Sequence, residues 1–165
     1  MLALGEDMLV KQIKQCFQTD TPMPAVLHEA AMKLYRQYLV VGGMPECVRE
    51  FAETKDHILV RNTQNTILAG YLNDMSKYSN LNEIKKTRLC YDNITVQLSK
   101  KNTRFQYKLI KKGGRAAEFE NAIEWLTLSG IVSQVYRLDK IKKPLENYRD
   151  IDAFKIYVSD LGLLC

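Results

Sequence analysis

A run of basic side chains in the second half of the chain is the strongest candidate for binding chemistry. Residues 100–115 contain seven cations and no acid, namely Lys100, Lys101, Arg104, Lys108, Lys111, Lys112 and Arg115. Because the whole chain has a net charge of only +5, the residues outside this segment are acidic overall. Lysine and arginine neutralise phosphates and release counterions, so the segment favours sequence-independent contact with nucleic acid.

A second basic group, made of Lys140, Lys142 and Lys143, lies further along the chain. We expect it to sit in a surface loop, where it could meet the first group on one nucleic-acid backbone. The two basic groups together form the predicted nucleic-acid-binding residues. No side chain in the sequence is predicted to be catalytic or to bind a metal.

Acidic residues between the two basic groups oppose this interpretation in part. Glu118, Glu120 and Glu124 fall on the outer face of an expected helix, where they repel phosphate and disfavour base readout. Phe105 and Tyr107 alternate with the cations, but we expect them to face the core. The sequence therefore leaves two interpretations open: contact with nucleic acid, or a basic edge that faces solvent or another protein.

Motifs for phosphate binding and nuclease chemistry are weak or missing. None of the eight glycines is followed by lysine, so a Walker-type phosphate loop is not found. The string Gly113-Gly114-Arg115 before a helix could hold an anion, although a tight turn explains it equally simply. Glu53-Thr-Lys55 and Glu83-Ile-Lys85 match the Glu-x-Lys pair of metal-dependent nucleases by letters only, because both lie in segments expected to be helical.

The cysteines and histidines do not form a recognisable metal or redox motif. The four cysteines are 31, 43 and 75 positions apart and the only histidines are His28 and His57. This spacing gives no zinc motif, so we expect structural thiols and no bound cofactor. The N-terminus lacks a signal peptide, and no apolar run approaches the ~18 residues that span a bilayer. We therefore expect a cytoplasmic protein without a membrane partner.

The elements that position these residues are expected to be mainly helical in the first half. Apolar residues recur at three- and four-residue steps over residues 6–17, 24–41, 45–51 and 56–78, which predicts four helices. The string Gly42-Gly43-Met44-Pro45-Glu46 predicts a sharp corner between the second and third of them. The alternative role for this corner is a contact surface for a neighbouring domain.

The second half is expected to mix helices and short strands. A helix opens at Ser79-Asn80 and extends to about Leu98, and a second one covers 116–128. The strands are expected at 105–110, 131–136 and 153–158, with a loop over 140–152. Helix, strand, helix, strand, loop, strand is the order of a winged helix. The sequence thus predicts a mainly α protein with a small β component, in which a helical bundle (1–78) precedes a winged-helix-like unit (79–165).

Four strings stand out along the chain: Tyr38–Val48 (YLVVGGMPECV), Gln97–Lys100 with Lys108 downstream, Ala122–Leu126 (AIEWL) and Phe154–Leu164 (FKIYVSDLGLL). They resemble, in the same order, those of a large prokaryotic family of AAA-type ATPases that carry a conserved C-terminal domain of unknown function. The resemblance implies that a P-loop core precedes this region and that a nuclease-like region follows it. It therefore implies a chain cut at both ends, the second subdomain being truncated at its C-terminus.

The resemblance and the basic residues together give the functional expectation. No catalytic residue of the family matches a position in this chain, so ATP and Mg²⁺ are implied for the parent protein only. We expect a non-catalytic module that binds DNA or couples it to the ATPase. The alternative is a protein–protein interaction or oligomerisation module that docks on the ATPase core or on another subunit. This alternative predicts a large exposed apolar patch on the first-half helices.

Overall fold

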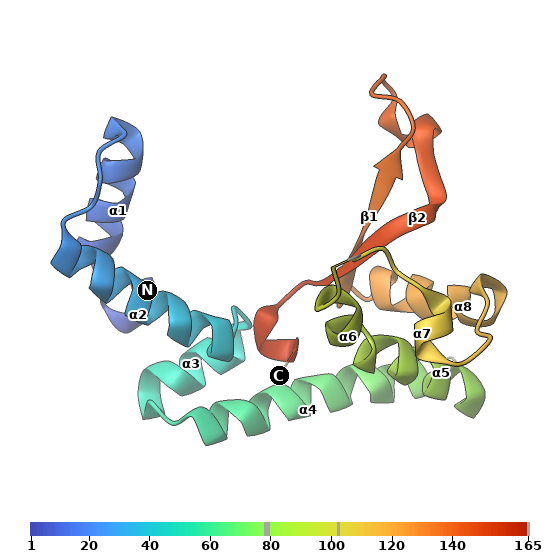
Figure 1. Cartoon of the computed structure of the whole chain (residues 1–165). Coiled ribbons are helices and arrows are strands. Elements are labelled where there is room, and N and C mark those ends of the chain that lie inside the picture. The colour runs from blue at the N-terminus through green and yellow to red at the C-terminus, as the bar shows by residue number, and fades with distance from the viewer. Residues whose placement is uncertain (78–79, 102, 165) are drawn as a thin grey trace. The chain divides into compact units, whose positions relative to one another are not determined.

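The computed structural model of the chain describes residues 1–77, 80–101 and 103–164. It is mainly helical with one two-stranded antiparallel sheet, which confirms the predicted class (Figure 1). Its residues cluster into two compact units: unit 1 holds Met1–Leu68 with the segment from Asp160 onward, and unit 2 holds Ala69–Ser159. The predicted boundary at 78 and 79 lies outside the described residues and stays a prediction.

The four helices predicted in the first half are present. They are α1 (Asp7–Thr19), α2 (Ala25–Val41), α3 (Pro45–Thr54) and α4 (His57–Ser76). The predicted end of α4 at Tyr78 lies outside the described residues. Pro45 occupies the first turn of α3, where its missing N–H costs nothing. The corner between α2 and α3 is thus confirmed as a helix–helix junction.

The core of unit 1 lies under this corner. Val41, Cys47, Phe51 and Val60 are buried together, and Met44 packs against them. The short 3-10 helix η3 (Leu161–Leu164) contacts α2, and its Leu163 is almost completely buried. The last segment of the chain therefore forms part of the core of unit 1.

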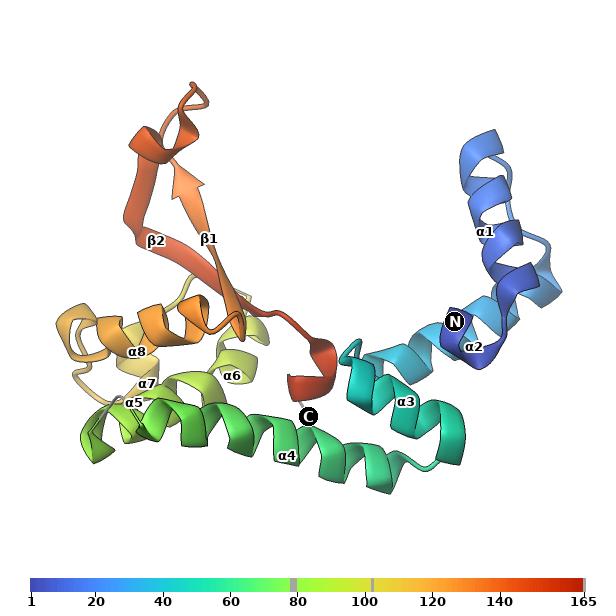
Figure 2. The ribbon, with the colours of Figure 1, turned by 180° about the vertical axis from the view of Figure 1, so that it is seen from behind.

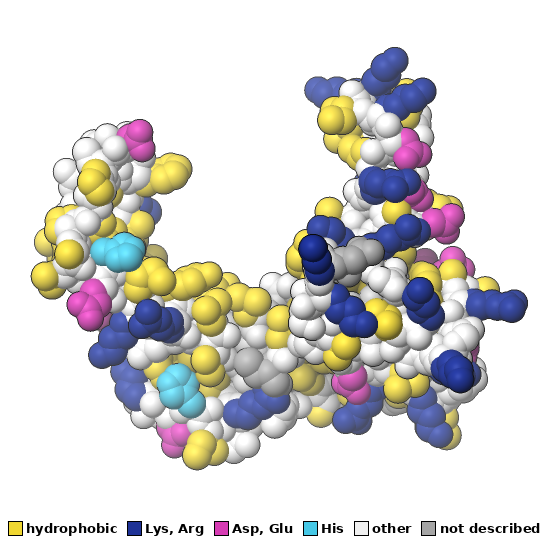
Figure 3. All heavy atoms as spheres, viewed as in Figure 1, with side chains coloured by type: hydrophobic (Ala, Val, Ile, Leu, Met, Phe, Trp, Pro, Cys, Tyr) yellow, Lys and Arg dark blue, Asp and Glu magenta, His cyan; other side chains and the backbone are white. Residues whose placement is uncertain are grey.

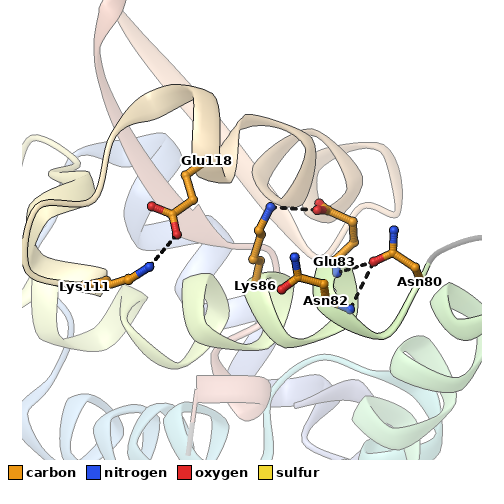
Figure 4. A network of polar contacts seen from close by, with 6 residues as sticks. All are labelled: Asn80, Asn82, Glu83, Lys86, Lys111 and Glu118. Atoms are coloured by element: carbon orange, nitrogen blue, oxygen red, sulfur yellow. Dashed lines mark hydrogen bonds and ion pairs between the residues drawn. The ribbon is translucent and has the colours of Figure 1, made fainter.

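After the last part of α4, unit 2 has two helices where the sequence predicted a single one. These are α5 (Leu81–Asp92) and α6 (Ile94–Leu98), separated at Asn93. The expectation of one continuous helix is wrong: α5 ends before Asn93, whose backbone N–H donates to the carbonyl oxygens of Cys90 and Tyr91 in place of an α-helical acceptor. The side-chain amide of Asn93 donates to the carbonyl oxygen of Leu109, 3.2 Å away. Asn80 caps the start of α5: its Oδ1 accepts the backbone N–H groups of Asn82 and Glu83, each at 3.0 Å (Figure 4). The opening position Ser79 lies outside the described residues.

The predicted strand at 105–110 is wrong, because α7 (Tyr107–Ile110) occupies most of that range. Only Phe105 keeps a strand-like contact, its N–H donating to the carbonyl oxygen of Phe154 at 2.8 Å. The buried side chain of Gln97 then takes the next backbone N–H, since its Oε1 accepts from Gln106 at 2.6 Å. The strand-like pairing with Phe154 therefore does not continue beyond Phe105, and α7 begins at Tyr107.

The rest of unit 2 follows the prediction more closely. Helix α8 (Ala116–Leu128) has the predicted bounds, and β1 (Val132–Leu138) and β2 (Arg149–Val158) form the predicted hairpin. The expected loop at 140–152 is too long, because it holds the 3-10 helix η2 (Leu145–Tyr148) and the start of β2. Pairing continues to Leu138↔Arg149, and the N–H of Asp139 still donates to the carbonyl oxygen of Tyr148.

Ring packing fixes the hairpin to the helices of unit 2. The ring of Phe154 lies 5.6 Å from Phe105, 6.3 Å from Tyr107 and 5.7 Å from Tyr136. Helix α8 contacts α5 and β1 (Figure 2) and buries Phe119 and Leu126. This aromatic core holds one end of the hairpin and leaves the other end free to project.

The described cysteines are buried and free. Cys16, Cys47 and Cys90 are at most 8% exposed and form no disulfide, while Cys165 lies outside the described residues. Burial raises the pKa of Cys47, with the charges of Asp160 and Glu46 adding to the effect, and it raises the pKa of Cys90 to about 12. Both thiols are therefore held protonated at neutral pH. Within residues 1–77, 80–101 and 103–164, no helix is both long enough and apolar enough to cross a bilayer.

Candidate nucleic-acid interface

The β1–β2 hairpin projects from the helices of unit 2 and carries the second predicted basic group at its tip (Figures 1 and 2). Lys140, Lys142 and Lys143 are all exposed. None of the three forms an ion pair with another described residue. Lys and Arg side chains gather at this tip in the space-filling view (Figure 3). The tip therefore presents three uncompensated positive charges.

Three acidic residues of the hairpin, Asp139, Glu146 and Asp150, pair with arginines rather than with these lysines. Arg137 pairs with Asp150 across the strands and lies 3.7 Å from Asp139. Arg149 lies 3.6 Å from Glu146. These exposed pairs contribute little stability, but they supply the carboxylates of Asp139, Glu146 and Asp150 with arginine partners. The lysines remain available for an anionic partner.

One residue of the first basic group lies against the hairpin. Nη2 of Arg104 donates to the carbonyl oxygen of Asp152 at 2.7 Å. The backbone hydrogen bond from Phe105 to Phe154 lies next to this contact. These contacts place the end of the 100–105 segment along β2. The structure therefore brings Arg104 to the strand that leads from the tip.

The outer face of the hairpin adds cations that the sequence did not single out. A depression of about 360 Å³ lies there, and it is lined by Arg104, Val135, Tyr136, Arg137, Ala153, Phe154, Lys155 and Tyr157. Val135 pairs with Lys155 and Ser133 with Tyr157, and directly paired residues share one face of a sheet. Val135 is 51% exposed and Tyr157 42% exposed. Alternation along each strand was the signal that could have identified Arg137, Lys155 and Tyr157.

The other predicted cations are not brought to the hairpin by any contact among the described residues. Lys100, Lys101 and Lys108 are exposed, as are Lys112 and Arg115 in the turn before α8. Lys111, in the same turn, is partly neutralised, because its Nζ lies 2.9 Å from Oε1 of Glu118 (Figure 4). The ten predicted residues thus form separate groups at the tip, along β2 and around α7.

The outer face of α8 is acidic. Glu120 and Glu124 line a groove of about 390 Å³, together with Tyr107, Asn121 and Gln134 among others. Burial raises the pKa of Tyr107 to about 12, and the nearby charge of Glu120 adds to the effect. A phosphate backbone cannot approach this face without repulsion. The acidic face of α8 is therefore unsuited to contact with nucleic acid.

The minor motifs of the sequence are accounted for by local structure. Gly113 has φ 78° and a side chain at Gly114 would lie 2.7 Å from the carbonyl oxygen of Tyr107, so this string makes a tight turn. Glu53 and Glu83 lie on the helices α3 and α5, as predicted, and not on strands. Among the described residues no three His, Cys, Asp or Glu side chains lie close enough together to hold a metal ion.

The glycine corner of unit 1 meets a residue that the sequence did not identify. Asp160 accepts the backbone N–H of Gly43 at Oδ2 (2.6 Å) and that of Gly162 at Oδ1 (2.8 Å). The buried Gln64 donates through Nε2 to the carbonyl oxygens of Val40 and Val41, at 2.9 and 3.2 Å. The corner thus contacts the chain's own last segment.

Comparison with known proteins gives a family but no described relative. No curated protein and no solved structure matches this chain. One family model matches residues 32–165, which include the glycine corner, the basic segment and the hairpin. The chain belongs to the family described as a domain of unknown function, DUF8612.

Proposed function

We propose that this chain is a non-catalytic module of a cytoplasmic AAA-type ATPase and that unit 2 binds the backbone of a nucleic-acid duplex through the β1–β2 hairpin. The observation that carries the proposal is the hairpin tip, with Lys140, Lys142 and Lys143 exposed and without ion-pair partners among the described residues. Lysines in this state release counterions from phosphates on binding.

The order of elements in unit 2 supports a winged-helix assignment. Apart from the short additional helix α6, the order of α5, the strand-like contact at Phe105, α7, α8 and the β1–β2 hairpin is that of a winged helix. The hairpin loop then corresponds to the wing. Since Glu120 and Glu124 make α8 repel phosphate, contact through the wing and the outer face of the hairpin is favoured over base readout.

The link to an ATPase rests on the strings that resemble that family. In this proposal the P-loop core of the parent protein supplies the ATP and Mg²⁺ chemistry. The present chain holds no cofactor and positions nucleic acid for that core. Its affinity is expected to be sequence-independent, because the available contacts are cations without a base-reading helix.

The test is anisotropy of a fluorescent duplex titrated with the whole chain at several salt concentrations. We expect salt-sensitive binding, with a logarithmic salt slope that falls by about 0.9 for every phosphate that a lysine no longer neutralises. The K140E/K142E/K143E variant should therefore bind much more weakly with a slope smaller by about 2–3. A matched control is K11E/K14E/K33E, which changes three exposed lysines of unit 1. Binding that is absent, or that both variants reduce equally, contradicts the proposal. Where binding depends on the tip, the K112E/R115E variant measures how far the interface extends toward α8.

A second candidate function is docking on another protein through unit 1. The observation that favours it is the set of exposed apolar residues on α1 and α2 (Figure 3), which are Met8, Phe17, Val26, Tyr35, Tyr38, Leu39 and Val40. A pocket of about 230 Å³ within unit 1 is lined by Leu34, Tyr35, Tyr38, Val48 and Phe51 among others. Surfaces of this kind are typical of interfaces between subunits.

Sedimentation velocity over a range of concentrations tests whether a second copy of the chain occupies that surface. The candidate predicts self-association that Y35K/L39K abolishes, since both side chains project from α2 one turn apart. As a control, I58K/L59K adds the same two charges at exposed apolar residues of α4, which are 73% and 41% exposed. A monomer at every concentration contradicts self-association and leaves the ATPase core as the partner to test.

A further inference from the structure

The tip of the hairpin carries an apolar side chain among its lysines. Ile141 is 91% exposed, the highest value of any large hydrophobic residue in the described part of the chain. It stands between Lys140 and Lys142, with Lys143 next in the chain. Turns and loops are usually built from glycine, proline, asparagine, aspartate and serine. An aliphatic side chain in this place needs a reason other than folding.

No packing against the described residues of unit 2 accounts for Ile141, which is 91% exposed. Strand pairing ends at Leu138 and Arg149, so the residue lies beyond the ladder. Leu145, later in the same loop, is itself 41% exposed. The side chain is therefore held in solvent at the far end of a projecting ribbon, where a partner can cover it.

The charge around Ile141 indicates an anionic partner. The three lysines are unpaired among the described residues, while the nearby carboxylates of Asp139, Glu146 and Asp150 are engaged by arginines. A partner that neutralises these lysines and also accepts an aliphatic group needs negative charge beside an apolar layer. Stacked base pairs between two phosphate backbones have this arrangement, and isoleucine is one of the side chains that wedge between base steps.

We propose that Ile141 is a wedge that inserts between adjacent base pairs of a bound duplex and kinks it. This inference rests on the proposed function, because the lysines must first bring the tip to the duplex. The kink exposes more of the duplex to the outer face of the hairpin, where Arg104, Lys155 and Tyr157 lie. Insertion also favours easily unstacked pyrimidine–purine steps, so a weak sequence preference arises without base readout.

An anionic membrane is the rival partner for a basic tip with an apolar side chain. Ile141 and the partly exposed Leu145 together offer less hydrocarbon than a myristoyl chain, which by itself binds membranes only marginally. The single wedge therefore fits a duplex better than a lipid surface. Vesicles of phosphatidylserine and phosphatidylcholine provide the comparison.

The experiment uses the whole chain and a duplex with a dye at each end and 2-aminopurine at a central TA step. Binding should raise energy transfer between the ends and raise 2-aminopurine fluorescence, because the duplex bends and the base unstacks. I141A should lose both signals while its affinity falls by about tenfold or less and its salt slope is unchanged, since the lysines remain. I141L should retain both signals. I58A removes another highly exposed isoleucine and should change nothing.

The outcomes separate the two proposals. Binding by the wild-type chain with no bend, or with a bend that I141A retains, overturns the wedge and leaves the proposed function standing. No salt-sensitive binding by the wild-type chain overturns the proposed function itself. Vesicle binding that depends on Ile141, without any duplex signal, overturns the wedge in favour of a membrane contact.

Discussion

The backbone N–H of Gly43 donates a 2.6 Å hydrogen bond to Oδ2 of Asp160, 117 positions further along the chain. The other carboxylate oxygen of Asp160 accepts the N–H of Gly162 at 2.8 Å. One side chain thus joins the α2–α3 corner to the segment that contributes the buried Leu163. The glycine corner lies near the start of the matched residues 32–165 and Asp160 lies near their end, and the two meet through this carboxylate.

Removing the carboxylate should weaken unit 1. D160A leaves the N–H groups of Gly43 and Gly162 without their acceptor, and hydrogen bonds to a charged group contribute about 1.5–3 kcal/mol when well shielded. Because Gly43 is exposed, we expect a total loss of about 1–3 kcal/mol in the free energy of urea unfolding. E29A, at an exposed position of α2, should stay within about 0.5 kcal/mol of the wild type. Equal values for the two variants would refute this role.

Gly42 should tolerate no side chain. Its φ of 76° and ψ of −165° lie in a region that is essentially restricted to glycine. A Cβ there would collide with Oδ1 of Asp160 and lie 2.8 Å from the amide nitrogen of Gly162. We expect G42A to cost about 2–4 kcal/mol by urea unfolding.

A substitution at a second glycine and a double mutant separate the two parts of the cost of G42A, the backbone strain and the collision with Asp160. An added Cβ at Gly70 meets no atom of the described residues within 4 Å. G70A should therefore stabilise α4 by up to about 1 kcal/mol. G42A should cost less in the D160A background, because the collision with the carboxylate is gone while the backbone strain remains. Additive effects of G42A and D160A would contradict the close approach.

The helices could be predicted from the sequence because local signals determine them. Apolar periodicity identified α1 to α4, and Ala116–Leu128 was predicted with its exact bounds. The glycine corner was predicted as a junction, but its partner was not. The hydrogen bond between Gly43 and Asp160 joins residues 117 positions apart, and such a contact produces no periodic pattern in the sequence.

The strand prediction at 105–110 failed for a comparable reason. The segment has the alternation and aromatic content of a strand, and Phe105 does bond to β2. The N–H of Gln106 instead donates to the buried side chain of Gln97, and α7 follows. Strand propensity is a local property and does not report such a tertiary contact. At the candidate interface, lysine composition identified the hairpin tip, whereas Arg137, Lys155 and Tyr157 emerged only once the pairing of the strands was known.

Gln97 should be required for the turn into α7. Its Oε1 accepts from the N–H of Gln106 at 2.6 Å, and its Nε2 donates to Oδ1 of Asn93 at 3.1 Å. Q97L keeps most of the volume but leaves these buried groups without partners, so we expect a loss of about 1–3 kcal/mol. Hydrogen exchange at the Gln106 amide should accelerate more than at the neighbouring amides. Q18L, at an exposed position of α1, provides the control; if exchange at Gln106 is unchanged in Q97L, the side chain does not hold this turn.

Stability should fall in alkaline solution partly through Tyr107. Burial, aided by the charge of Glu120, raises the pKa of this phenol from 10.0 to about 12. The folded state therefore favours the protonated form. The contribution is fully present below pH 10 and is lost as pH rises from 10 toward 12. Y107F removes the ionising group, so its unfolding free energy should decline less steeply than that of the wild type over this window. Parallel pH profiles of the two proteins would show that Tyr107 ionises as freely in the folded state as in the unfolded one.

The acidic face of α8 should limit the affinity for nucleic acid. Glu120 and Glu124 lie one turn apart, are exposed, and form no ion pair with any residue that the structure describes. Replacing them in E120K/E124K exchanges repulsion for attraction near the hairpin, so duplex affinity should rise at least about tenfold at low salt with a steeper salt slope. E46K/E50K makes the same charge change with the same spacing on α3 of unit 1. A rise confined to the α8 variant places the duplex beside unit 2. Equal rises for both variants would instead reflect net charge alone and would remove the argument that α8 faces the bound nucleic acid.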